Sequence, residues 1–277
     1  MLNILIILIL TSICCSILGV FIVLRKASML TDAISHTVLL GIVLAYFVVG
    51  NLDSPLLIVG ASLMALITVI IIEFLGNTKL VSSSDAIGVV YPILLSISVI
   101  LISKFFKSTH LDTDIVLMGN IIISSLPTIN IFGLEVSVSL AYAVGLLSIL
   151  LLYILVLNKE LKISIFDEEY AKLIGVPVGF IFYSLMSLTS ITAVISFNIL
   201  GSMLVISYFV APASIALLFT KRLNKTVFLT VIVSAISCII GYFIAINLNV
   251  SISGVCATIN MLLYIFAIVY SRVRGKL

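Results

Sequence analysis

The chain has 277 residues, of which 63% are hydrophobic and only 9% are charged. Soluble domains carry about 25% charged residues, so the composition excludes a soluble domain of appreciable size and indicates an integral membrane protein. The net charge of +3 does not indicate a nucleic-acid-binding protein, because the basic residues stand at the ends of apolar runs, where they set membrane topology.

Nine apolar runs have the length of about 20 residues that a membrane helix needs. They comprise residues 2–24, 30–50, 55–75, 85–103, 134–157, 177–196, 199–220, 226–247 and 252–271. The first run is too long for the core of a signal peptide, so we expect it to be a retained span. The prediction is an all-α membrane protein, a polytopic bundle of about nine helices that forms a single transmembrane domain over residues 1–277.

The basic residues predict the orientation of these spans. With the N-terminus outside, twelve of the fourteen basic residues fall on the cytoplasmic side, and only Lys104 and Lys107 fall outside. The positive-inside rule therefore favours a multi-pass protein of the cell membrane with nine spans and its C-terminus in the cytoplasm. The turn between the sixth and seventh spans is expected near Asn198, where no charge marks a loop.

The second span, residues 29–50, contains Asp32 and His36. On a helix, residues four apart lie on one face, so the carboxylate and the imidazole can converge on one point. Both groups are ligands for divalent transition metals, and a charged residue inside a membrane helix costs about 2.5 to 3.5 kcal/mol, which makes it a candidate for a functional site. The alternative is a buried Asp and His that hydrogen-bond to neighbouring helices.

Polar residues at the ends of the next spans have structural interpretations. Asp85 follows Ser82 at the start of the fourth span, where a helix needs capping acceptors. Glu73 closes the third span and is expected to reach water. The apolar piece Ile115–Ile123 in the non-spanning stretch 104–133 is too short to cross, and we expect an interfacial or re-entrant segment there. Glu135 is interpreted either as a solvated flank of the fifth span or as part of an outer gate.

The loop over residues 158–176 contains the sequence FDEEYAKLIGVP. Asp167 is a candidate N-cap, Glu168 and Glu169 suit the first turn of a helix, and Gly175 suits its end. This predicts a helix of about two turns with its apolar residues on one side: Phe166, Tyr170, Leu173 and Ile174. So short a helix needs a surface to lie on, which is either the membrane or a cytoplasmic partner protein.

Four cysteines, Cys14, Cys15, Cys238 and Cys256, lie within apolar runs and show no C-x-x-C spacing. We therefore expect small packing residues, not disulfides or metal ligands. No catalytic motif and no site for a permanently bound cofactor is predicted.

Six stretches, taken together and in order, resemble the membrane permease subunits of bacterial ABC transporters that import manganese, zinc or iron. They are SMLTDAISHTVLLGIVLAYF, SSDAIGVVYP, DTDIVLMGNI, FDEEYAKLIGV, LGSMLVISYFVAPASIALLFTKRL and SISGVCATINMLLYIF. The resemblance covers most of the chain. The chain departs from it at Leu40, where the family usually has a proline before the glycine.

The resemblance implies an ATP-driven importer in which this chain carries the transported Mn²⁺ or Zn²⁺, most likely manganese by resemblance only, past Asp32 and His36. It also implies partners: a cytoplasmic ATPase subunit, an extracytoplasmic metal-binding protein and a second permease chain, identical or related, in the lipid bilayer. The coupling element to the ATPase would comprise Phe166, Asp167, Glu168, Tyr170, Ala171 and Gly175. The chain contains no Walker A pattern, so ATP hydrolysis is expected on a separate polypeptide.

Two other classes of protein remain as alternatives. An ion-coupled secondary transporter would also hold Asp and His inside the membrane, but it usually has internal repeats, which are not found in this sequence. An intramembrane metalloenzyme would need a third ligand and a general base, and there is no H-E-x-x-H motif.

Overall fold

The computed structural model describes residues 2–51, 54–78, 81–105, 121–131 and 134–273. Within these residues, nine helices are long and apolar enough to cross a bilayer, which confirms the predicted all-α membrane bundle. The nine are α1 (Leu2–Leu24), α2 (Ser28–Val49), α3 (Leu56–Asn77), α4 (Ser83–Phe105), α7 (Val138–Phe166), α9 (Val178–Leu200), α10 (Ser202–Phe219), α11 (Leu223–Leu248) and α12 (Ile252–Val273). The short elements are α6 (Ile121–Ser124), β1 (Thr128–Ile131), β2 (Leu134–Ser137) and α8 (Glu168–Leu173).

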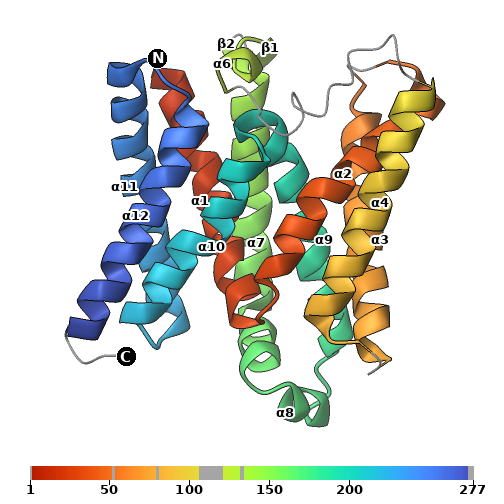
Figure 1. The fold of residues 1–277 in the computed structure, drawn as a ribbon. Coiled ribbons are helices and arrows are strands. Elements are labelled where there is room, and N and C mark those ends of the chain that lie inside the picture. Colours follow the sequence, from red (N-terminus) through yellow and green to blue (C-terminus); the bar gives the residue numbers. More distant parts are fainter. Residues whose placement is uncertain (1, 52–53, 79–80, 106–120, 132–133, 274–277) are drawn as a thin grey trace.

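Helix α1 lies at the centre of the bundle, where it contacts α7, α9, α10 and α11. Its apolar window is 72% buried, compared with 17% for α4, α7 and α12. Helices α2, α3 and α4 pack together on one side of α1, and α10, α11 and α12 pack together on the other (Figure 1). The chain begins at one end of the bundle and finishes at the other, the end that also carries α8 and that we call the α8 end.

The fifth span differs from its prediction at both ends. Residues 134–137 form strand β2, which pairs antiparallel with β1, so that Asn130 lies opposite Glu135. The helix begins at Val138 and continues to Phe166, past a non-helical residue at Leu157 (φ −104°, ψ 20°). The predicted loop 158–176 is thus partly helical. Apolar character alone does not separate a strand from a helical turn, and residues after Leu157 continue the helix in a new direction.

The turn between α9 and α10 lies at Gly201, three residues beyond the predicted position. Gly201 has φ 84° and ψ 153°, a conformation that residues with a Cβ rarely adopt. Asn198 remains inside α9, where its side-chain amide donates to the Val194 carbonyl at 3.2 Å. Because the Asn198 amide is hydrogen-bonded within α9, its polarity does not mark the end of that helix.

Two smaller predictions are confirmed. The Asp85 backbone N–H donates to Ser82 Oγ at 3.2 Å, which is an N-cap at the start of α4, and the Ser82 hydroxyl donates to Asp85 Oδ2 at 2.6 Å. The four cysteines are free and buried, and Cys238 Sγ lies at hydrogen-bonding distance, 2.9 Å, from the hydroxyls of Ser12 and Tyr208.

The segment predicted over Ile115–Ile123 lies mostly outside the described residues, within which only Ile121 onward forms α6. Glu73 is partly exposed, as expected of a residue that reaches water. Its Oε2 atom alone is shielded from solvent and has no hydrogen-bond partner among the described residues.

Glycines let the central helices approach closely. A Cβ atom at Gly19 on α1 would collide with the backbone carbonyl of Phe209 on α10, and a Cβ at Gly41 on α2 would lie 2.6 Å from the Gly60 carbonyl on α3. Association of membrane helices depends on such contacts, since lipid tails are as apolar as the side chains.

We expect Gly19→Val to destabilise the bundle by at least about 1–3 kcal/mol, the usual cost of overpacking, because its Cβ meets backbone that cannot rotate away. Thermal unfolding in detergent, followed by size-exclusion chromatography, measures the effect. Gly145→Val on α7 is the matched control, since nothing lies within 4 Å of a Cβ there. Equal melting temperatures for both variants would contradict the close α1–α10 contact.

Candidate functional site

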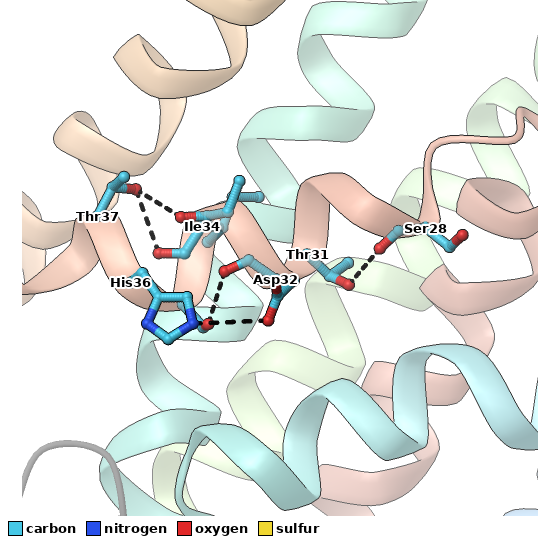
Figure 2. A network of polar contacts seen from close by, with 8 residues as sticks. Ser28, Thr31, Asp32, Ile34, His36 and Thr37 are labelled. Carbon is cyan, nitrogen blue, oxygen red and sulfur yellow. Dashed lines mark hydrogen bonds and ion pairs between the residues drawn. The ribbon is translucent and has the colours of Figure 1, made fainter. Parts of the chain in front are cut away.

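Asp32 and His36 project from α2 one helical turn apart, and their side chains lie next to each other (Figure 2). His36 Nε2 is 3.7 Å from Asp32 Oδ1, and the two side chains are 31% and 45% exposed, respectively. Helix α2 is long and apolar enough to cross a membrane. The structure therefore brings the two predicted residues together, partly exposed, on a helix of membrane-spanning length.

The geometry of the pair suits a divalent metal ion. Nitrogen and oxygen ligands bind such ions at about 2.0–2.2 Å, so two ligand atoms can share one ion only if they lie within about 4.2 Å of each other. The distance of 3.7 Å meets this condition. No group of three or more His, Cys, Asp or Glu side chains is gathered anywhere in the described residues, so one chain supplies a pair of ligands and not a full coordination sphere.

The hydroxyl groups around the pair are engaged elsewhere. Ser35 Oγ donates to the Asp32 backbone carbonyl at 2.7 Å, and Thr37 Oγ1 donates to the Ala33 carbonyl at 3.0 Å. Among the described residues, the only polar side-chain contact of Asp32 and His36 is the one between them. The alternative of a pair that hydrogen-bonds to neighbouring helices therefore finds no support in this part of the chain.

Tyr91 on α4 is a site residue that the sequence did not identify. Its ring stacks on the His36 imidazole with the centroids 5.4 Å apart and the planes at 23°. The stack limits the rotation of the imidazole about its own axis and so helps to aim Nε2. Tyr91 lies in one of the stretches of family resemblance, next to Pro92, but an aromatic residue within an apolar span does not reveal which helix it faces.

The predicted helix in the loop is α8, and its ends are as expected. Asp167 Oδ1 accepts a hydrogen bond from the Tyr170 backbone N–H at 2.9 Å, which is an N-cap. Gly175 has φ 81°, and the N–H groups of Gly175 and Val176 donate to the carbonyls of Lys172 and Ala171 at 3.2 and 2.9 Å. This pattern is a Schellman motif, which requires the left-handed conformation that glycine adopts freely.

The apolar residues of α8 face outward. Tyr170 is 53% exposed and Leu173 is 84% exposed, whereas Ala171 on the opposite side is fully buried. Glu168 pairs with Lys172 at 2.7 Å on the surface. An open groove of about 470 Å³ separates α8 from the end of α7; it is lined by Lys159, Lys162, Ile163, Phe166, Asp167 and Tyr170. The α8 end thus presents an apolar and basic surface.

Comparisons with known proteins agree with this architecture. The model of the ABC 3 transport family matches residues 1–271. The manganese transport system membrane protein MntD of Bacillus subtilis is 38% identical over 270 residues, covering 96% of this chain and 90% of the relative. The zinc transport system membrane protein TroD of Treponema pallidum is 37% identical over 264 residues, covering 95% and 72%.

Solved structures share the fold. PsaBC from Streptococcus pneumoniae in complex with Fab superimposes with a TM-score of 0.78 at 30% identity, covering 96% of this chain and 89% of that chain. An inward-facing metal-chelate type ABC transporter gives a TM-score of 0.70 at 16% identity, covering 97% and 85%, and so supports the fold alone. The chain belongs to the ABC 3 transport family and is a multi-pass membrane permease subunit of an ABC transporter, not an enzyme.

Proposed function

We propose that this chain is the permease of an ATP-driven importer of divalent transition metal, foremost manganese, and that Asp32 and His36 bind the ion during its passage. The observation that carries the proposal is the 3.7 Å separation of a carboxylate oxygen and an imidazole nitrogen, both on partly exposed side chains of a helix of membrane-spanning length. The relatives named for manganese, zinc and iron transport support the substrate class.

Manganese is the preferred ion because the manganese relative is the most similar of these three. A mixed oxygen and nitrogen ligand set also accepts zinc, and the Irving–Williams order favours zinc at equal availability. We therefore assign the choice of metal to an extracytoplasmic binding protein that delivers the ion. No thiolate takes part, since the cysteines are buried elsewhere, and a site without thiolate can release its ion.

The site is completed by a second permease chain. Asp32 and His36 offer two ligands, and the exposed fractions of their side chains leave one face of the pair uncovered. A second chain, identical or related, would place its own pair against the first and provide up to four ligands. Tyr91 holds the imidazole in position while the ion exchanges its ligands.

Helix α8 is the docking element for a cytoplasmic ATPase subunit. Its exposed residues Tyr170 and Leu173 lie on a helix of only six residues that is capped at both ends, so a partner meets a preformed apolar surface. Closure of the ATPase dimer would push on α8 and tilt the spans. This role sets the orientation, with the α8 end in the cytoplasm and the N-terminus outside.

The ligand assignment predicts that Asp32→Asn and His36→Ala each reduce uptake of Mn²⁺ and Zn²⁺ at least about 100-fold. Mutation of a residue that only hydrogen-bonds to a metal ligand already lowers metal affinity or activity about 10–100-fold, and loss of a ligand itself should cost more. The double variant should be no worse than either single one, since both residues act as one site. Isotope uptake into cells, normalised to protein in the membrane, measures the change. Asp85→Asn on α4 is the control for loss of a carboxylate; wild-type uptake by the two site variants would contradict the assignment.

The docking role predicts that Gly175→Val lowers copurification of the ATPase subunit, because valine strains the left-handed end of α8 (φ 81°). Gly175→Asn should retain more of the partner, since asparagine tolerates this conformation. The control is Gly179→Val on α9, where the added Cβ meets nothing within 4 Å. Full ATPase recovery with Gly175→Val would argue against α8 as the docking helix.

The orientation predicts which introduced cysteines react in intact cells. Because the native cysteines are buried, an impermeant maleimide should not label the wild-type chain. Val250→Cys at the end of the bundle opposite α8 should label from outside, and Asn224→Cys only after the cells are opened. Thr109, a second position expected outside, lies beyond the described residues. Labelling of position 224 in intact cells would reverse the orientation.

A further inference from the structure

The connection between α1 and α2 is short and closely hydrogen-bonded. The Lys26 N–H donates to the Val23 carbonyl and the Ala27 N–H to the Ile22 carbonyl, both at 3.0 Å. Lys26 has φ 57°, so α1 ends in a Schellman motif with a lysine at the left-handed position. Helix α2 begins at Ser28. A displacement of this turn is therefore passed directly to the helix that carries Asp32.

The Arg25 side chain ties this turn to two other helices. Its Nη2 atom donates to Ser164 Oγ on α7 at 3.1 Å. Its Cζ atom lies 5.2 Å from the centre of the Phe182 ring on α9, a cation–π contact. Ser164 is buried and stands three residues before Asp167, the N-cap of α8. The Arg25 guanidinium thus connects the N-terminal end of α8 to the N-terminal end of α2.

Arg25 has an unmatched donor, and Glu73 on α3 has an unmatched acceptor. The Arg25 Nε–H is shielded from solvent and has no hydrogen-bond partner among the described residues, and the same holds for Oε2 of Glu73. Burial lowers the pKa of the Arg25 guanidinium, and the nearby negative charges of Glu168 and Glu73 act in the opposite direction. A buried polar atom without a hydrogen-bond partner is costly, so a bond between Arg25 Nε and Glu73 Oε2 would be favourable.

We propose that Arg25 is the positioning residue that couples α8 to the metal-site helix, and that its guanidinium exchanges Ser164 for the Glu73 carboxylate between two states of the transport cycle. In the described state Arg25 is bonded to α7. Movement of α7 and α8 would release Ser164, and pairing with Glu73 would satisfy both unmatched atoms. Because the Arg25 backbone is part of the α1–α2 turn, the exchange shifts α2 relative to α3, and with it Asp32 and His36.

The inference rests on the proposed transport function, and its test separates the two. The complex purified through a tag on this chain is reconstituted in proteoliposomes, and Mn²⁺ uptake and ATP hydrolysis are both measured. Arg25→Gln should reduce Mn²⁺ taken up per ATP by about tenfold, the shift expected when one charge-assisted hydrogen bond is lost from a two-state element. Equilibrium Mn²⁺ binding and copurification of the ATPase should stay at wild-type level.

Lys26→Gln is the matched control, since it removes a neighbouring exposed charge and should leave uptake per ATP unchanged. A merely structural role for Arg25 predicts that uptake and hydrolysis fall together with the amount of complex. That result, or an unchanged ratio in Arg25→Gln, would overturn the inference while wild-type uptake still supports the proposed function. Absence of uptake by the wild-type complex would instead contradict the proposed function.

Glu73→Gln provides a second variant that leaves the Ser164 contact intact. It should lower uptake per ATP to a similar extent, and the Arg25→Gln, Glu73→Gln double variant should match either single one, because both residues act through one pair. Additive losses would show that Arg25 and Glu73 do not pair in the cycle and would remove Glu73 from the proposal.

Discussion

The lack of water in the bilayer core is the constraint on which this structure depends. Every polar group there must find its partner within the protein. Thr11, Thr68 and Thr189 meet this requirement locally, because each hydroxyl donates to the carbonyl four residues earlier at 2.7 to 2.8 Å. Such bonds pair the hydroxyl groups within their own helices, so α1 can lie at the centre of the bundle and approach α10 closely at Gly19. The bundle is held by close backbone contact together with a small number of polar bonds between helices, such as the bond from the Asn260 amide on α12 to Ser207 Oγ on α10 at 3.1 Å.

Against this background, Asp32 and His36 stand out because they lack such local partners. Their only polar contact among the described residues is with each other, although a charged group in a membrane helix is costly. A passing divalent cation would stabilise both groups at once. Binding there would be reversible, since the described part of the chain offers two ligands and no thiolate at the pair. A site of this kind suits transport better than storage.

The α8 end of the bundle contains a different arrangement of charge. Arg25 of the α1–α2 turn contacts Ser164 on α7 and Phe182 on α9, and it lies within the electrostatic influence of Glu73 on α3. The surface of α8 is preformed by its N-cap and its left-handed glycine, whereas the group behind it holds unmatched donors and acceptors. Helix α8 is therefore rigid, whereas the contact of Arg25 with Ser164 leaves one donor of the guanidinium unpaired. Such a contact can rearrange when α8 moves, and the rearrangement would displace α2. The proposed metal site lies on α2, which follows the α1–α2 turn of three residues that contains Arg25.

The sequence by itself determined the number of spans, the Asp32–His36 pair and both caps of α8. Each depends on neighbours within a few residues: the length of an apolar run, a spacing of four on a helix, or a glycine after a capped turn. It misplaced the turn at Gly201 and the start of α7, because apolar residues suit a strand, a helix and a bend alike. Tertiary structure alone decided that Tyr91 stacks on His36 and that Arg25 reaches Ser164. Those contacts join helices far apart in the chain, and a uniformly apolar sequence carries no periodic signal for which helix faces which, since lipid and protein are equally apolar neighbours.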